Sequence, residues 1–263
     1  MRHDAPAAPK AGRQAPRAAL AASRAPGSWG GAGRGDAVGP HGLILVVSTL
    51  VTADLALIFL WVPTETLAMG VVQRIFYFHV PLAWVGFLAF GVVFVASILF
   101  LWRGGRRWDA LAHASAEVGV VFTTLMLFSG STWAKPVWGV WWTWDPRLTT
   151  SLILWLLYVA YLMVRAYAPT PAQAARYAAV LGTISFIDVP IVYFSVVWWR
   201  NIHPEIIVGP TAQPGSLEPE MLVTLLFSLL TFTLLFAYLL WERVRLREAE
   251  DAVRSLRGLE RSE

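Results

Sequence analysis

Tryptophan is concentrated in one short segment of the chain. Five of the fourteen Trp lie between residues 133 and 144, and an aspartate follows directly; these residues are Trp133, Trp138, Trp141, Trp142, Trp144 and Asp145. Four of these residues stand at i, i+3, i+4 and i+7, namely Trp138, Trp141, Trp142 and Asp145. A helix would place these four on one face. A flat surface of indole rings suits a large, planar, apolar ligand. It equally suits a membrane interface, where Trp is common.

Two histidines are the candidate metal ligands. His79 lies in the sequence His79-Val80-Pro81, and His203 follows a Trp198-Trp199 pair by a few residues. The chain has no Cys, which excludes disulfides, thiolate ligands and a cysteine nucleophile. Neutral imidazoles are good axial ligands for haem iron, and indole rings could stack on a porphyrin. Each histidine alone could instead be a hydrogen-bonding residue at a membrane surface.

The composition indicates a membrane protein. Of its 263 residues, 57% are hydrophobic and only 14% are charged, whereas a soluble domain has about 25% charged residues. Six apolar runs are long enough to cross a bilayer, which takes about 20 residues. They cover approximately residues 43–62, 80–102, 111–132, 148–167, 177–197 and 221–241. The predicted fold is therefore all-α, a polytopic membrane protein with six transmembrane helices and a Trp-rich amphipathic segment, residues 133–147, on the outer surface.

Positive charge is distributed unevenly between these spans. Seventeen of the 21 Lys and Arg lie in the termini and in the connections after the second and fourth spans. Six spans place these segments on one side of the membrane, and the positive-inside rule makes that side cytoplasmic. We therefore expect both termini to be cytoplasmic, most simply at a bacterial inner membrane. The Trp-rich segment, His79 and His203 then lie on the outer side.

The chain divides into three parts on this topology. Residues 1–41 are rich in Ala, Pro, Gly and Arg without an apolar run, and are predicted to be a disordered cytoplasmic tail. Residues 42–241 form the transmembrane domain. Residues 242–263 are predicted to be a charged cytoplasmic tail, either a solvated helix or a frayed end. The net charge of +4 is spread along the ends and loops with no nucleic-acid motif, so nucleic acid is not an expected partner.

The four remaining cations accompany the candidate ligands on the outer side. They are Arg74, Lys135, Arg147 and Arg200. Each lies close in sequence to His79, to the Trp-rich segment or to His203. Arg and Lys would pair with the propionates of a haem. Lipid headgroup phosphates are the alternative ligands.

Three acidic residues within the spans leave two other functions open. Asp54, Glu117 and Asp188 would be costly in lipid, so they could line a polar path of a transporter for haem or another small solute. They could equally bond to polar neighbours on adjacent helices, and Asp188-Val189-Pro190 also permits a simple helix kink. A membrane redox subunit with a bound haem is the other alternative, although the spans contain no second buried pair of histidines.

The Trp-rich segment also carries a family resemblance. Residues 138–145 fit the pattern WGxWWxWD, which is typical of the WWD-domain membrane proteins that handle haem in cytochrome c maturation. The chain length, the six spans, His79 before Pro81 and Trp198-Trp199 before His203 make the chain similar to the haem exporter protein C (CcmC) family. The resemblance covers approximately residues 43–241, and both tails fall outside it.

The resemblance implies a haem-delivery protein and not an enzyme. It implies that His79 and His203 provide the metal ligands for a transiently and non-covalently bound haem b at the outer face. It further implies that Trp138, Trp141, Trp142, Trp144 and Asp145 form a platform for haem and for a periplasmic haem chaperone (CcmE). Trp133, just before this pattern, is a further candidate haem contact. The other partners that it implies are an ATP-binding cassette complex (CcmA and CcmB) and a small accessory membrane protein (CcmD).

Overall fold

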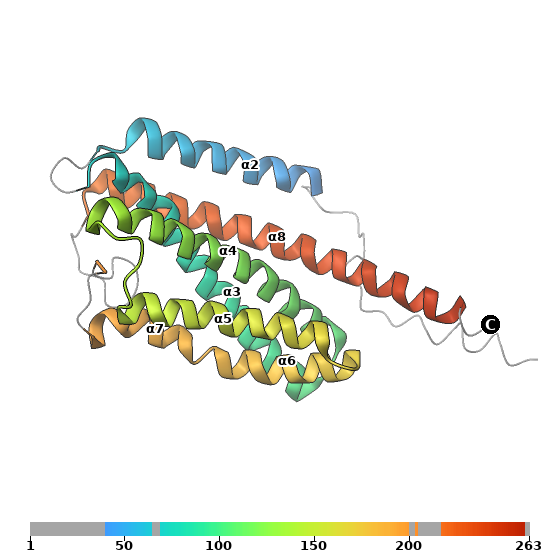
Figure 1. Cartoon of the computed structure of the whole chain (residues 1–263). Coiled ribbons are helices and arrows are strands. Elements are labelled where there is room, and N and C mark those ends of the chain that lie inside the picture. Colours follow the sequence, from blue (N-terminus) through green and yellow to red (C-terminus); the bar gives the residue numbers. More distant parts are fainter. Residues whose placement is uncertain (1–39, 65–68, 200–202, 205–216, 261–263) are drawn as a thin grey trace, which may run out of the picture. The chain divides into compact units, whose positions relative to one another are not determined.

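The chain folds into a bundle of long helices (Figure 1). The structure, a computed structural model, describes residues 40–64, 69–199, 203–204 and 217–260. The α-helices in this part of the chain are α2 (Pro40–Ala56), α3 (Phe76–Arg103), α4 (Arg106–Trp138), α5 (Pro146–Tyr167), α6 (Pro171–Ser185), α7 (Asp188–Trp198) and α8 (Pro219–Glu260). A π-helical turn, η1 (Leu57–Trp61), extends α2, and a 3₁₀ helix, η2 (Val71–Ile75), leads into α3.

Six helical stretches are long and apolar enough to cross a membrane, as the sequence predicts. They are Gly42–Trp61, Val71–Arg103, Arg106–Trp138, Pro146–Tyr167, Pro171–Trp198 and Pro219–Arg254. Each contains one of the six predicted spans or matches it within a few residues. The prediction of an all-α, polytopic membrane protein is therefore confirmed.

The connections between the spans follow from local residue chemistry. Gly104 and Gly105 join α3 to α4 with φ angles of 67° and 101°, which favour glycine because it has no Cβ. At the start of α6, the Thr170 side chain accepts a hydrogen bond from the backbone N–H of Gln173, and Pro171 occupies the first helical position. Side-chain capping and an N-terminal proline are typical of helix starts.

Pro81 and Pro190 have different effects on the helices that contain them. Pro81 lies inside α3, because this helix begins at Phe76, earlier than the predicted span of residues 80–102, and His79 therefore lies within the helix and not before it. This position is tolerated because Pro81 removes only one hydrogen bond, to the carbonyl of residue 77. Pro190 does interrupt its span, because its ring opposes the carbonyl of Phe186, where α6 has ended and α7 has not begun. The kink that the sequence permitted at this site is confirmed.

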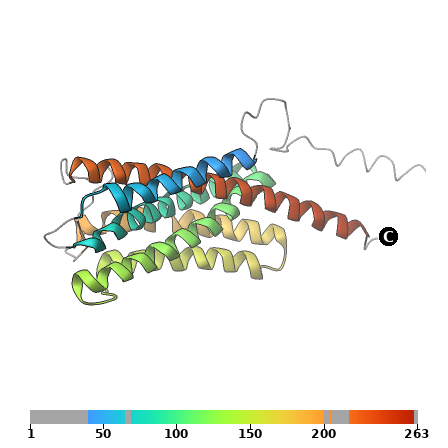
Figure 2. The same cartoon turned by 90° about the horizontal axis from the view of Figure 1, so that it is seen from above.

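The helices pack around α3 and α4. Helix α3 contacts α4, α6 and α8, while α5 contacts α4, α6 and α7, and α2 packs on α8. The largest buried cluster lies between α3, α4, α5, α6 and α7, and includes Phe90, Leu154 and Tyr158. Figures 1 and 2 show that α8 projects past the other helices at the end of the bundle opposite the connection between α4 and α5.

The predicted division at residue 242 does not correspond to a break in the structure. Helix α8 runs without interruption to Glu260, and its charged part begins by packing on α4. Arg243 donates hydrogen bonds to both carboxylate oxygens of Glu117, at 2.7 and 2.9 Å, and Arg247 adds another at 2.9 Å. These ion pairs hold the start of the predicted tail against the bundle. The predicted N-terminal tail lies outside the described residues, except that Pro40 and His41 begin α2.

Candidate functional site

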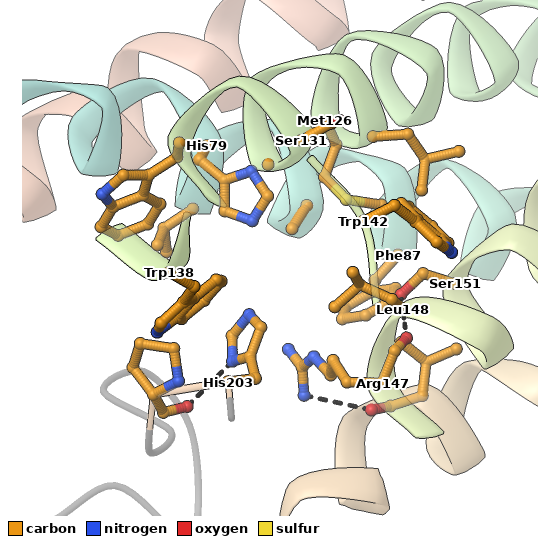
Figure 3. Close-up of a pocket in the computed structure, with 17 residues that line it drawn as sticks. His79, Phe87, Met126, Ser131, Trp138, Trp142, Arg147, Leu148, Ser151 and His203 are labelled. Carbon is orange, nitrogen blue, oxygen red and sulfur yellow. Dashed lines mark hydrogen bonds between the residues drawn. The ribbon is translucent and has the colours of Figure 1, made fainter. Parts of the chain in front are cut away.

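A pocket opens at the end of the bundle where α4 connects to α5. Helices α3, α4, α5 and α7 contribute to it, together with residues 142, 203 and 204 from the connections (Figure 3). It is lined by His79, Val80, Ala83, Phe87, Met126, Leu127, Gly130, Ser131, Trp133, Trp138, Trp142, Arg147, Leu148, Ser151, Val192, His203 and Pro204. The two candidate histidines, more than 120 residues apart in the sequence, therefore face the same space. Most of the remaining lining is apolar.

The Trp-rich segment is not a single helix, which was the condition for the shared face of Trp138, Trp141, Trp142 and Asp145. Helix α4 ends at Trp138 because Gly139 adopts a left-handed conformation, with φ of 78°. The Gly139 N–H donates to the carbonyl of Lys135 at 3.0 Å, and the Lys135 ammonium donates to the carbonyl of Gly139 at 2.8 Å. This left-handed cap stops the helix. Residues 139–145 form an irregular connection before α5 begins at Pro146, so the expected common helix face is wrong.

The irregular connection divides the tryptophans between two environments. Trp133, Trp138 and Trp142 line the pocket. Trp141 and Trp144 are 58% and 76% exposed and do not line it. The ring of Trp144 packs edge-to-face on that of Trp142, with centroids 5.9 Å apart. One short segment therefore presents indoles both to the pocket and to the outside of the bundle.

Asp145 acts locally as a helix cap. Its carboxylate accepts hydrogen bonds from the backbone N–H groups of Arg147 and Leu148 at 3.0 and 3.2 Å, and from the Thr143 hydroxyl at 2.6 Å. Pro146 occupies the first position of α5. This arrangement satisfies the otherwise unpaired N–H groups of the first turn. Asp145 thus fixes the point at which the chain enters α5, two residues before Arg147.

The surroundings of His79 define which ring nitrogen carries its lone pair. Its Nδ1 lies 3.1 Å from the Ser129 hydroxyl, and that hydroxyl donates its single proton to the carbonyl of Met126 at 3.0 Å. The Ser129 oxygen must therefore accept, so His79 Nδ1 carries the hydrogen and Nε2 the lone pair. Trp133 packs edge-on against the ring at 5.8 Å between centroids. The imidazole is held in one orientation by α4.

His203 has the same tautomer for an independent reason. Its Nδ1 lies 2.9 Å from the carbonyl oxygen of Pro204, which can only accept, so Nδ1 donates and Nε2 is the deprotonated nitrogen. Burial lowers the pKa of His203 to about 4, and the positive charge of Arg147 adds to this effect. The ring is therefore neutral at neutral pH. A neutral imidazole with its other nitrogen hydrogen-bonded is the form that binds a metal.

Of the three outer cations that the structure describes, Arg147 is the one that lines the pocket. Its guanidinium donates from Nη1 to the carbonyls of Val192 and Tyr193 on α7, both at 3.1 Å. Lys135 caps α4, and the Arg74 guanidinium lies 5.5 Å from the centroid of the Phe59 ring; neither lines the pocket. Arg200 lies outside the described residues.

Gly130 is a pocket residue that the sequence did not identify. A Cβ atom at this position would lie 2.8 Å from Cε1 of His79, closer than real Cβ contacts allow. The imidazole therefore occupies the space that Gly130 leaves on α4. The run Ser129-Gly130-Ser131, three small residues within a span, was the available signal, because small residues permit close approach between membrane helices.

We expect Gly130→Ala to displace the His79 ring without unfolding the protein. Alanine favours a helix over glycine by about 1 kcal/mol, so any loss of function would not reflect a weaker helix. The expected result is a marked loss of ligand binding at His79 with unchanged thermal stability, measured on the purified protein by absorption spectroscopy and by a melting curve. Gly91→Ala is the matched control, because its Cβ would meet only Phe186, at an ordinary 3.8 Å. Equal ligand binding by both variants would contradict the steric argument.

Six spanning helices and this pocket define a class of protein. It is a multi-pass membrane protein with a mostly apolar pocket at one end of its bundle, lined by two imidazoles, three indoles and the Arg147 guanidinium. Imidazole nitrogens can bind a metal, indoles suit a flat apolar surface, and a guanidinium suits an acidic group.

Comparison with known proteins identifies the family. The chain belongs to the haem exporter protein C (CcmC) family, whose description is "Heme exporter protein C" and whose model matches residues 37–257. It is 38% identical over 194 residues to the heme exporter protein C of Bradyrhizobium diazoefficiens, which covers 73% of each chain. It is also 38% identical to that of Escherichia coli K12 over 173 residues, 65% of this chain and 69% of the relative.

A third relative extends the comparison to organelles. A ccmC-like mitochondrial protein of cytochrome c biosynthesis from Marchantia polymorpha is 32% identical over 183 residues, 68% of this chain and 78% of the relative. Family membership confirms the resemblance predicted from residues 138–145 and the two histidines. It assigns the chain to membrane components that handle haem for cytochrome c maturation, and not to enzymes.

Proposed function

We propose that this protein binds haem b, non-covalently and transiently, in the pocket and delivers it to a periplasmic haem chaperone (CcmE) for cytochrome c maturation. The observation that carries the proposal is that two imidazoles, each hydrogen-bonded through Nδ1, line one indole-lined pocket, which leaves Nε2 of each ring as the nitrogen for a metal. His79 and His203 are the proposed iron ligands. Trp133, Trp138 and Trp142 are the proposed contacts for the porphyrin.

The size of the pocket supports partial enclosure of the haem. The cavity has a volume of about 120 Å³. Pockets that enclose a whole small-molecule ligand usually measure roughly 300–1,000 Å³. A haem held here would therefore be bound by one edge or face, with the rest accessible. Such a site suits a ligand that is passed on to another protein.

Arg147 is the proposed partner of a haem propionate. It is the pocket-lining cation among the described residues, and its guanidinium is held by two carbonyl oxygens of α7 that leave other N–H groups available for a carboxylate. Lys135 and Arg74 lie outside the pocket lining, so a propionate would reach them only at its rim. Arg200, in a segment outside the described residues, keeps its predicted role as a proposal.

The exposed tryptophans are the proposed docking surface for the chaperone. Trp141 and Trp144 lie outside the pocket but on the same connection as Trp142, so a partner that bound them would be next to a partly exposed haem. The distribution of Lys and Arg supports an inner-membrane topology with cytoplasmic termini and a periplasmic pocket. CcmA, CcmB and CcmD remain proposed partners through family membership.

The two alternative functions have less support from the described residues. Asp54 accepts a hydrogen bond from Ser228 at 2.7 Å, and Glu117 is held by two arginines, so each has a packing role without a transport path. His113, the other histidine of the described spans, lies 2.7 Å from Arg247 Nη2 and is not paired with a second imidazole. A buried bis-histidine site for electron transfer is therefore not supported within these ranges.

Transfer of haem from the purified protein tests the proposed function. The full-length protein in lipid nanodiscs should show a b-type haem spectrum, and the spectrum should move to the chaperone after mixing and separation of the two proteins. Arg147→Gln should retain less haem than Lys135→Gln, which removes a cation outside the pocket. A protein that binds no haem when haem is supplied, or one that holds haem but never loads the chaperone, would refute the corresponding step.

The pKa of His203 predicts how haem binding depends on pH. A proton on the imidazole competes with the iron for the same nitrogen. A histidine with an ordinary pKa would therefore bind the iron more weakly as the pH falls below about 6.5. Because burial lowers the pKa of His203 to about 4, the nitrogen stays available as the pH falls below 6 and is protonated only near 4. A titration of the haem absorption band should therefore be flat down to about pH 5. A midpoint near 6.5 would contradict the assignment of a buried His203 as ligand.

A further inference from the structure

Five buried polar groups surround the break between α6 and α7. They are the hydroxyls of Ser97, Tyr158, Tyr161 and Ser185 and the Oδ2 atom of Asp188, and none makes a hydrogen bond of normal geometry to another described residue. The Tyr161 hydroxyl also lies beside the Arg165 guanidinium, which therefore borders the group on one side. The first three residues are 0% exposed, Ser185 is 2% exposed and Asp188 is 9% exposed. Buried polar atoms normally have a partner, so this group of five requires an explanation. The group lies outside the haem pocket, because none of the five residues lines it.

Several contacts show that these groups lie close together in the bundle. The rings of Tyr158 and Tyr161 have centroids 6.3 Å apart. A Cβ on Gly182, one turn before Ser185, would lie 3.0 Å from the Tyr161 ring and 3.2 Å from the Ser97 hydroxyl. Asp188 stands three residues after Ser185, directly across the break in the helix. Three elements, α3, α5 and the joint of α6 and α7, thus direct polar groups into one region.

No described cation neutralises Asp188. The nearest charged side chain on α5 beyond the tyrosines is Arg165, and both of its terminal nitrogens are held by Asp109 of α4, at 2.6 and 2.8 Å. At the other end, Arg147 is bound to α7 carbonyls in the pocket. Helices α3 and α6 contribute only the hydroxyls of Ser97 and Ser185 to the group. A carboxylate without a cation in the interior of a membrane protein is strongly disfavoured.

The helix dipole of α7 opposes protonation of Asp188, but this effect is the weaker one. Asp188 is in the first turn of α7, where the dipole favours a negative charge. The dipole effect is small beside the cost of removing an unpaired carboxylate from water. Hydroxyl groups can each donate and accept, and water is the usual partner of buried polar atoms that have none in the protein.

We propose that Asp188 and the four hydroxyls form a hydrated proton-binding site at the joint between α6 and α7. Asp188 holds one proton as a neutral carboxylic acid, and water molecules connect it to the tyrosine and serine hydroxyls. A break in a membrane helix with a polar interior is a common place for ion binding. The haem-handling role does not require this site, and the site does not require haem.

Helix α7 connects this site to the haem pocket. It begins at Asp188, and one turn later its Val192 and Tyr193 carbonyls hold Arg147. Its last residue, Trp198, precedes the segment that leads to His203. Loss of the proton would place a charge at the start of α7 and favour rearrangement of the joint. This coupling, unlike the proton site, rests on the proposed function of the pocket.

Infrared spectroscopy of the full-length protein in nanodiscs tests the proton site. A protonated carboxylic acid gives a carbonyl band that a carboxylate lacks. We expect such a band at neutral pH that disappears in Asp188→Asn and persists in Asp54→Asn, a matched change of another buried aspartate. Tyr158→Phe should shift the band, because it changes the hydrogen bonding of the acid. A band unaffected by Asp188→Asn overturns the proposal. If that variant does not fold, the absence of any shift in both Tyr158→Phe and Tyr161→Phe overturns it.

Haem retention tests the coupling separately. At alkaline pH, where Asp188 loses its proton, the unmodified protein should release haem, while Asp188→Asn, which stays neutral, should retain it. Equal release by the two proteins would refute the coupling and leave the infrared result intact. A protein that binds no haem at any pH would refute the proposed function and not the proton site.

Discussion

Replacing both His79 and His203 by alanine is expected to abolish haem binding. The two imidazoles are the described pocket groups that can ligate iron strongly, because the chain has no Cys. Loss of a group that only hydrogen-bonds to a metal ligand typically lowers the affinity for the metal 10–100-fold. Loss of either histidine ligand itself should therefore lower the affinity for haem by at least roughly that much. The absorption spectrum of the purified protein with added haem is the measurement. Each single variant should show a weakened and shifted band, and the double variant should show none.

Two controls separate ligation from general damage. His113→Ala removes a histidine at the opposite end of the bundle, where it lies 2.7 Å from Arg247, and should leave the haem spectrum unchanged. Ser129→Ala removes the hydroxyl that fixes the His79 tautomer and should weaken binding less than His79→Ala does. A normal spectrum in a folded double variant would show that neither histidine is required. The pocket would then have to bind its ligand through the indoles and Arg147.

The six spans could be predicted from the sequence because they depend on a local property, apolar runs of about 20 residues, which requires no knowledge of tertiary contacts. The orientation inferred from the distribution of Lys and Arg stays a prediction. The end of α4 and the start of α5 within the Trp-rich segment also depend on local residue types. Asp145-Pro146 has the residue types of a helix cap and first position, and Gly139 suits a helix end. These local signals contradict a helix through residues 138–145, and they outweigh the i, i+3, i+4, i+7 spacing.

The geometry of the pocket could not be predicted in the same way. The tautomer of His79 depends on Ser129, fifty residues away, and its ring position depends on the missing Cβ of Gly130. The place of Arg147 in the pocket depends on the Val192 and Tyr193 carbonyls of α7, which accept hydrogen bonds from its guanidinium. Each of these is a contact between helices, so it exists only once the spans have packed. The sequence identified the residue types, and tertiary structure determined which of them meet.

Substitutions of the tryptophans are expected to separate haem binding from haem delivery. Trp138→Ala and Trp142→Ala remove indoles that line the pocket, and should weaken haem binding by roughly tenfold or more, since an aromatic contact contributes about 0.5–1.5 kcal/mol beyond the burial of its area and 1.4 kcal/mol is a factor of ten. Trp141→Ala and Trp144→Ala change exposed rings and should leave the haem spectrum nearly intact. Substitution of these two exposed tryptophans should instead abolish transfer of haem to the chaperone.

This separation depends on the irregular conformation of residues 139–145. In a single helix Trp138, Trp141 and Trp142 would share one face, so substitution of Trp141 would reduce binding and delivery together, as substitution of Trp138 or Trp142 would. Because Gly139 ends α4, Trp142 turns to the pocket while Trp141 and Trp144 remain on the outside. Haem content and chaperone loading should therefore be measured on the same preparations. Trp84→Ala is the control, because Trp84 is an exposed indole on α3 outside the pocket, and its Nε1 donates a hydrogen bond to the Thr233 hydroxyl at 3.0 Å. If Trp141→Ala and Trp144→Ala lose haem as Trp142→Ala does, the two surfaces act as one. If they lose neither haem nor delivery, their indoles serve only to anchor the segment at the membrane interface.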